Sequence, residues 1–212
     1  MSVNNLNIEK IILASGSKFR QGLLKATGLD FEVKTSKVDE SKIVEPTGAK
    51  MALARAHAKA KAVAEGVRSG LVIGADQTLS FNGKIYDKAS SRGEARDRLK
   101  EFSGNIHHLH SAVCIYLAKD GQVRLLSDFC VDVAMDMKEL NDKAIEAYLD
   151  SGEWDGCVGC YQAENKGALL FNSIGGDNSQ VIGLPMCELS TCFDNLGITI
   201  LENPNGPWVI KG

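Results

Sequence analysis

IILASGSKFR, residues 11–20, is an apolar run that meets a serine-rich turn and then passes into a helical pattern. The pattern predicts a buried strand over residues 11–15 and a helix over 18–27, which Gly28 ends. The turn places the hydroxyls of Ser15 and Ser17, free backbone N–H groups and the guanidinium of Arg20 at the helix N-terminus. An anion is favoured there because the unpaired amides and the helix dipole both attract negative charge. These three residues are candidate phosphate ligands; a helix cap beside a surface arginine is the alternative.

Strand and helix patterns alternate along the rest of the chain. We expect strands over 31–35, 71–75, 79–81, 84–86, 112–118, 123–133 and 168–174, and helices over 49–65, 93–102, 140–149 and 185–195. Asn82-Gly83 predicts a hairpin between two of these strands. Interleaved helices and hairpins favour an α/β fold, with a mixed sheet flanked by helices. No linker or repeat divides the chain, so we expect one domain over 1–212, with a peripheral tail over 198–212.

The composition excludes two large classes of protein. With 44% hydrophobic and 24% charged residues in 212, the chain is typical of a globular domain. Its net charge of −3 argues against binding polymeric nucleic acid, so any anion must be held by a local cluster of Lys and Arg. A membrane partner is not expected, because no apolar run reaches the roughly 20 residues of a membrane helix. Residues 1–10 lack the apolar core of a signal peptide, so we expect a cytoplasmic protein with free thiols.

Two acidic positions are suited to a divalent cation. Asp76 follows the apolar strand 71–75, and open α/β sheets place their ligands at the C-terminal ends of such strands. Its carboxylate can bind a metal or take a proton from water; an aspartate that caps a turn is the alternative. Glu40, from the Asp39-Glu40 pair, would add a second oxygen ligand of the kind that Mg²⁺ or Mn²⁺ takes from protein.

Other polar residues have simpler interpretations. Lys59 and Lys88, taken singly, belong on the surface. Cys157-x-x-Cys160 and Cys187-x4-Cys192 supply four thiols, but the second pair is spaced along a predicted helix so that both do not aim at one Zn²⁺. Ordinary buried thiols are the simpler interpretation. A histidine cluster at positions 107, 108 and 110 is expected on an exposed loop or strand edge rather than in a metal pair.

A succession of short motifs runs through residues 11–197: Ser15-x-Ser17-x-x-Arg20, Val38-Asp39-Glu40, Lys59-Ala60, Ile73-Gly74-Ala75-Asp76, Asp87-Lys88, Ser103-Gly104-x-x-His107, Gly152-Glu153 and Val181-Ile182-Gly183-Leu184-Pro185. Their order resembles the Maf family of nucleoside triphosphate pyrophosphatases. The resemblance implies an elongated, twisted mixed sheet flanked by helices, in two lobes with a central cleft, as in Maf and inosine triphosphatase proteins. It also implies hydrolysis of a nucleoside triphosphate to the monophosphate and pyrophosphate, a divalent cation (Mg²⁺ or Mn²⁺) and a homodimer.

The resemblance assigns roles to individual residues. The family's proton acceptor falls on Asp76, which would hold the metal together with Glu40. Its phosphate-binding residues fall on Ser15, Ser17 and Arg20, and its two lysines on Lys59, a substrate ligand, and Lys88, which acts in catalysis. The side chains of Arg20, Lys59 and Lys88 would stabilise the negative charge that builds on the leaving pyrophosphate.

The chain departs from the general family pattern at four places. Lys18-Phe19-Arg20 replaces Pro-Arg-Arg, Ala89 replaces the proline after the lysine, and Gln77 and Glu164 stand where thymidine- and uridine-type members have Thr and Gln. Phe19, Gln77, Ser103-Gly104-Asn105 and Glu164 resemble instead the subgroup that acts on 7-methyl-GTP. A methylated guanine is positively charged, which suits the carboxylate of Glu164 and a stacking ring at Phe19 or Trp154.

Two other functions compete with this hypothesis. One is a catalytically weak nucleotide-binding regulator of cell division, which would keep the phosphate-binding residues and lose the catalytic base. Asp76 and Glu40 are both present, which favours the enzyme. A zinc or redox protein would be built on Cys157 and Cys160.

Overall fold

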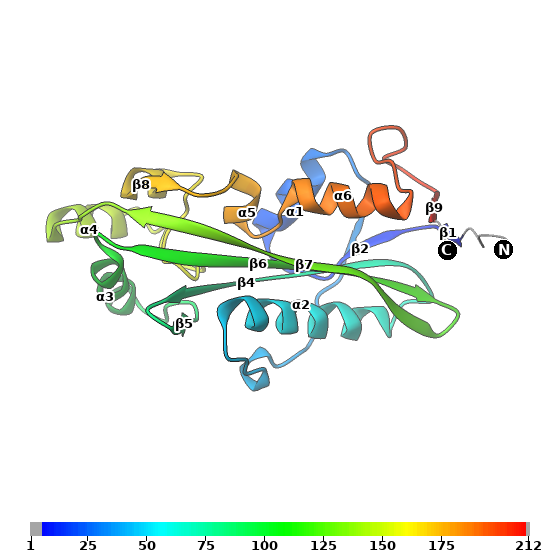
Figure 1. The fold of residues 1–212 in the computed structure, drawn as a ribbon, viewed down its shortest axis with the longest axis horizontal. Helices are drawn as coiled ribbons and strands as arrows, with labels where there is room; N and C mark the ends of the chain where they lie inside the picture. The colour runs from blue at the N-terminus through cyan, green and yellow to red at the C-terminus, as the bar shows by residue number, and fades with distance from the viewer. Residues whose placement is uncertain (1–5, 211–212) are drawn as a thin grey trace.

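Three long strands form the framework of the protein in the computed structural model, which describes residues 6–210 (Figure 1). They are β4 (Ser69–Phe81), β6 (Ile106–Lys119) and β7 (Gln122–Met137), and each pairs antiparallel with the next. They belong to a seven-stranded mixed sheet in the order β3-β2-β4-β6-β7-β8, with β5 paired to β4. The short strands of this sheet are β2 (Ile11–Leu13), β3 (Glu32–Val33), β5 (Lys84–Tyr86) and β8 (Phe171–Ile174).

Helices cover both faces of this sheet, which confirms the α/β expectation (Figure 1). One face carries α2 (Gly48–Ala64), and the other carries α1 (Lys18–Ala26), α5 (Asn178–Ile182) and α6 (Met186–Leu196). At one end of the sheet lie α3 (Arg92–Phe102) and α4 (Asp142–Leu149). Two 3₁₀ helices, η1 (Glu40–Lys42) and η2 (Lys166–Leu170), lie in the connections.

Three apolar clusters hold these layers together. One lies under α2, where Ala56 and Ala60 meet Val72 and Ala112. A second lies on the opposite face under α1 and α6, and the third lies among α3, α4 and the ends of the long strands. Because β4, β6 and β7 supply residues to more than one cluster, the two ends of the molecule share one continuous sheet.

Side-chain caps fix where the helices begin. Ser17, Thr47, Ser91 and Asn141 each accept a hydrogen bond from the backbone N–H three residues later. This satisfies a donor that the helix itself leaves unpaired. The caps place the starts of α1 and α2, which border the site described below.

Several strands are longer than their apolar patterns predict. The strand expected over 71–75 continues to Phe81, so Asp76 lies inside β4 and not at its end. Gln77 and Thr78 in this extension find hydrogen-bond partners in other segments; the Thr78 hydroxyl, for example, donates to the Gly48 carbonyl at 2.8 Å. The Asn82-Gly83 hairpin is confirmed by the pairing of β4 with β5.

Two expectations near the C-terminus are wrong. Residues 168–170 belong to η2, so only the second half of the strand expected over 168–174 is present. The tail over 198–212 is not merely peripheral, because β9 (Trp208–Ile210) pairs with β1 (Leu6–Ile8) and buries Trp208 and Ile210.

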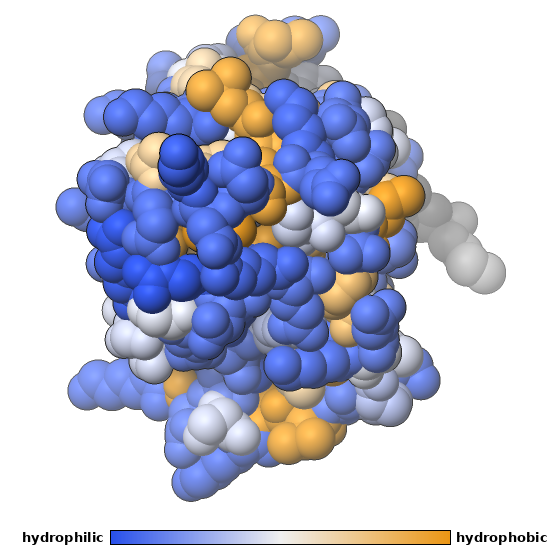
Figure 2. Space-filling model, turned by 90° about the vertical axis from the view of Figure 1, so that its left-hand side faces the viewer, coloured by the Kyte–Doolittle hydropathy of each residue, from blue (hydrophilic) through white to orange (hydrophobic). Residues whose placement is uncertain are grey.

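One end of the molecule has a mostly polar surface. Figure 2 shows the end with α3, α4 and β8 as mostly hydrophilic, interrupted by small apolar patches. Among the described residues, no helix is both long enough and apolar enough to cross a bilayer.

Candidate active site

A pocket of about 840 Å³ brings the predicted site residues together. Its walls come from the start of α1, the segment 35–41, α2, β4, the turn at 87–88, the loop 156–164 and α5. The lining includes most of the candidates named from the sequence: Ser15, Ser17, Phe19, Arg20, Glu40, Lys59, Asp76, Gln77, Lys88 and Glu164. Trp154, the second candidate for stacking, instead packs partly buried against the core around α3 and α4.

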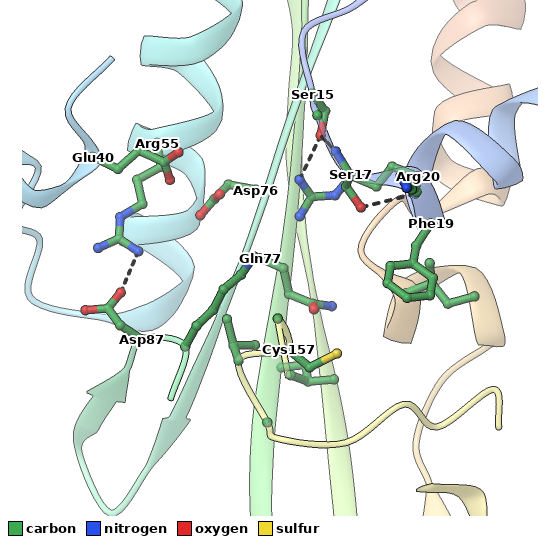
Figure 3. A pocket seen from close by; sticks show the side chains of 18 of the residues that line it. Ser15, Ser17, Phe19, Arg20, Glu40, Arg55, Asp76, Gln77, Asp87 and Cys157 are labelled. Atoms are coloured by element: carbon green, nitrogen blue, oxygen red, sulfur yellow. Dashed lines mark hydrogen bonds and ion pairs between the residues drawn. The ribbon is translucent and has the colours of Figure 1, made fainter. Parts of the chain in front are cut away.

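The loop before α1 forms one wall. Ser17 caps the helix, accepting from the Arg20 N–H at 3.4 Å, and Arg20 turns back beneath the loop. Its guanidinium donates to Ala75 O at 3.0 Å, Gly183 O at 2.8 Å and Ser15 Oγ at 3.3 Å. Burial lowers the pKa of Arg20, and the charges of Asp76 and Glu40 oppose that shift. Arg20 is thus a fixed cation inside the pocket, so the interpretation as a surface arginine is wrong (Figure 3).

A lysine joins the two acidic candidates in the opposite wall. Lys59 Nζ lies 2.5 Å from Asp76 Oδ1 and 3.6 Å from Glu40 Oε2. Both Lys59 and Asp76 are buried, which strengthens their interaction relative to a surface ion pair. The sequence interpretation of Lys59 as an isolated surface cation is therefore wrong, because its helix packs directly against β4.

Asp76 has one oxygen free for chemistry. Within residues 6–210, Asp76 Oδ2 is buried and has no hydrogen-bond partner. An unpaired buried carboxylate oxygen is costly unless a cation or proton donor reaches it. No group of three or more Asp, Glu, His or Cys side chains able to hold a metal is found among the described residues. Asp76 and Glu40 nevertheless fit Mg²⁺ or Mn²⁺, since such ions often take only one or two carboxylates beside water and substrate phosphates.

The residues that distinguish the subgroup come from α1, β4 and the loop 156–164. Gln77 Nε2 donates to Val181 O at 2.8 Å and to Ser111 Oγ at 2.9 Å, which fixes the side-chain amide. Phe19 is 44% exposed and borders the pocket, with its ring free to stack (Figure 3). Glu164 and Cys157 come from the loop 156–164, and burial raises the pKa of the Cys157 thiol to about 11.

Arg55 and Asp87 also line the pocket, and sequence reasoning missed both. Arg55 Nη1 lies 3.0 Å from Asp87 Oδ1. Arg55 precedes Lys59 by four residues in the predicted helix, so the two share one helix face. Once Lys59 was a candidate, this spacing could have indicated that Arg55 also faces the pocket.

The histidine expectation is wrong for two of three residues, because β6 extends across them. His107 is fully buried, stacked on Phe102, with Nε2 2.7 Å from the Tyr161 hydroxyl. His110 is buried between Ser80 at 2.7 Å and Asp132 at 2.6 Å. Only His108 is exposed.

The four candidate zinc thiols lie apart in the fold. Cys160 is buried in the core around α3 and α4, whereas Cys192 packs against the core under α1 and α6. The four do not form one metal site.

The chain is similar to several known proteins. The family model described as Maf-like protein matches residues 10–196. A protein of Nitrobacter hamburgensis named nucleoside triphosphate pyrophosphatase is 38% identical, covering 90% of this chain and 96% of the relative. A protein of Bartonella henselae named 7-methyl-GTP pyrophosphatase is 42% identical, covering 85% of this chain and 92% of the relative. A solved structure of a HAM1 protein from Coxiella burnetii aligns with a TM-score of 0.41 and 15% identity, covering 88% of this chain and 99% of that one.

Proposed function

This chain belongs to the Maf family, and from that premise we propose that it hydrolyses a nucleoside triphosphate to the nucleoside monophosphate and pyrophosphate. The observation that supports this most strongly is the position of Asp76. Its free Oδ2 lies in the same pocket as the anion-binding loop before α1. A base and a phosphate site in one pocket are what hydrolysis of a phosphoanhydride requires.

Asp76 acts in this proposal as the base. Its Oδ2 takes a proton from the water that attacks the α-phosphorus, while the Lys59 ammonium holds Oδ1 and fixes the direction of the carboxylate. The bond between the α-phosphorus and the bridging oxygen breaks, and pyrophosphate leaves. A divalent cation held by Asp76 and Glu40 would neutralise charge on the phosphate oxygens.

The cations of the pocket bind and stabilise the phosphates. Arg20 and the free N–H groups at the start of α1 contact the phosphate chain from one side, and Lys88 contacts it from the turn at 87–88. Because three hydrogen bonds hold the Arg20 guanidinium in place before substrate arrives, it stabilises the charge of the transition state without reorganising.

We propose that the nucleobase of the substrate is 7-methylguanine. Phe19 offers an exposed ring for stacking on a cationic base, and Glu164 offers a carboxylate in the same pocket. The name of the Bartonella henselae relative is in line with this choice, while the Nitrobacter hamburgensis relative has the general name. A nucleotide panel therefore decides the substrate.

Pyrophosphate release is the test. The purified protein is incubated with Mg²⁺ or Mn²⁺ and, in turn, 7-methyl-GTP, GTP, dTTP and UTP. We expect 7-methyl-GTP to have the highest kcat/KM. Asp76→Asn should lower kcat by about 10²- to 10⁴-fold, the usual contribution of a general base. The protein should still fold, with a lower unfolding temperature because Lys59 loses its buried ion-pair partner.

Asp97→Asn is the matched control, since Asp97 is an exposed aspartate of α3 outside the pocket. Its rate should equal that of the unmodified protein. Retained turnover in Asp76→Asn would place the base elsewhere. Nucleotide binding without pyrophosphate release from any substrate would favour the non-catalytic regulator instead.

A further inference from the structure

The surroundings of Arg55 are not explained by a role in stabilising the fold. Its side chain is only 13% exposed, and within the described residues its buried Nε has no hydrogen-bond partner. Its ion-pair partner, Asp87, is 76% exposed. Figure 3 shows the guanidinium extending from α2 into the pocket, with Asp87 at its tip.

This pairing contributes little to folding. An ion pair with an exposed carboxylate is worth about 0–1 kcal/mol at most, whereas a buried guanidinium with an unsatisfied N–H is costly to the folded state. A guanidinium held in a pocket by one displaceable carboxylate is instead arranged to receive an anion. Asp87 can turn into solvent, because most of its side chain is already exposed.

The position of Arg55 indicates which part of the substrate it meets. It lies one helical turn from Lys59, so it is adjacent to the Lys59–Asp76 pair. The α-phosphate must lie beside that pair for Asp76 to activate the attacking water. It also lies on the opposite side of the pocket from Phe19, the proposed stacking ring for the base (Figure 3). Arg55 thus lies on the side of the reacting phosphate that is away from the nucleobase.

We propose that Arg55 binds the terminal phosphates of the substrate, the pair that leaves as pyrophosphate, and that Asp87 holds the guanidinium in place until they arrive. This rests on the proposed function. A guanidinium can donate two parallel hydrogen bonds to a phosphate, which is stronger than one bond to an exposed carboxylate. When the α–β bridge breaks, charge builds on the oxygen of the leaving pyrophosphate, where Arg55 stabilises it.

The test compares inhibition by the two products. Arg55→Met and Arg55→Lys are assayed for kcat/KM and for the Ki values of inorganic pyrophosphate and of the nucleoside monophosphate. For Arg55→Met we expect kcat/KM to fall and the pyrophosphate Ki to rise, each about 10- to 100-fold, as for loss of a charged hydrogen bond. The monophosphate Ki should change less than about twofold, because that product lacks the terminal phosphates.

Two controls separate substrate binding from a structural effect. Arg92→Gln removes an arginine that pairs with Glu146 outside the pocket and should leave both Ki values unchanged. Asp87→Asn removes the carboxylate that holds Arg55 but leaves the guanidinium, so it should raise the pyrophosphate Ki far less than Arg55→Met does.

The ratio of the pyrophosphate Ki to the monophosphate Ki decides the outcome. An unchanged ratio in the folded Arg55 variants, or an equal rise for Asp87→Asn and Arg55→Met, would overturn the proposal and leave Arg55 as a support for the turn at 87–88. If Arg55→Met does not fold, Arg55→Lys provides the ratio. Calorimetric binding of pyrophosphate measures the Arg55 contribution even if the protein hydrolyses no nucleotide, so the two proposals fail separately.

Discussion

The charges that line the pocket differ in balance from the charge of the whole chain. The chain has a net charge of −3, yet the lining contains five cations, Lys18, Arg20, Arg55, Lys59 and Lys88, against four carboxylates, Glu40, Asp76, Asp87 and Glu164. Two of the carboxylates are already joined to Lys59. The pocket thus has one cation more than it has carboxylates, the local composition that a bound anion would require.

His107 gives the folded protein a dependence on pH. Burial lowers its pKa to about 3, whereas an unfolded histidine titrates near 6.5. Between these values the unfolded chain binds a proton that the folded protein excludes, so the free energy of unfolding falls as the pH falls. The contribution is fully present above pH 6.5 and decreases by about 1.4 kcal/mol per pH unit below it.

We therefore expect the protein to lose about 2 kcal/mol of stability through His107 between pH 6.5 and pH 5. Urea unfolding at both pH values measures this loss in the unmodified protein and in His107→Phe, which lacks the titrating ring. His107→Phe should be less stable at neutral pH, because the Tyr161 hydroxyl loses its partner, but its stability should change less with pH. His108→Gln, at the exposed neighbour, should keep the full dependence; equal slopes in all three proteins would contradict the argument.

At the scale of elements, the approach of α2 to β4 determines the geometry of the site. Gly74 makes the approach close: a Cβ there would lie 2.6 Å from Ala60 Cβ and 2.5 Å from Ala56 O. Both contacts are too short for real atoms, so the helix would have to move. Because α2 holds Arg55 and Lys59 while β4 holds Asp76, any such shift also separates the charged groups.

Gly74→Ala should thus affect stability and activity together. We expect a loss of about 1–3 kcal/mol, typical of overpacking, and a lower rate of pyrophosphate release. Gly22→Ala is the matched control, since Gly22 lies in α1 with no atom within 4 Å of an added Cβ. It should leave activity intact and add about 0.5–1 kcal/mol through helix propensity. Urea unfolding and the release assay measure both effects; an active, fully stable Gly74→Ala would show that the helix does not need this contact.

Element types were predictable from the sequence, but element lengths were not. Apolar periodicity identifies the start of β4, and it fails at Gln77 and Thr78 because polar residues interrupt it. Those side chains are satisfied by Ser111 and Gly48, which are distant in the chain. His107 and His110 are likewise buried through Tyr161 and Asp132. A local pattern contains no information about such partners, so it predicts strands that are too short.

At the scale of the whole molecule, site residues were predictable where their motifs follow the order known from the family. Site residues outside those motifs were not predictable. Ser15 and Arg20 share one segment, and Glu40 and Asp76 come from two others; the family resemblance indicated that the three segments meet. Arg55 lies outside those motifs. Its place in the pocket follows from the packing of α2 on β4 and from the turn that presents Asp87, both of which require the folded chain.

The tail closes the molecule by joining its first and last described strands. β9 pairs with β1, and Trp208 enters the core under α1 and α6 while its Nε1 donates to Asn203 O at 2.8 Å. Since Trp208 is only 4% exposed, Trp208→Ala should destabilise the protein by about 3–5 kcal/mol through the lost apolar contacts and the cavity that remains. Val209→Ala is the control on the same strand: Val209 is 44% exposed, and its change should stay within about 0.5 kcal/mol. Urea unfolding at neutral pH measures both, and similar small losses for the two variants would mean that the tail is peripheral after all.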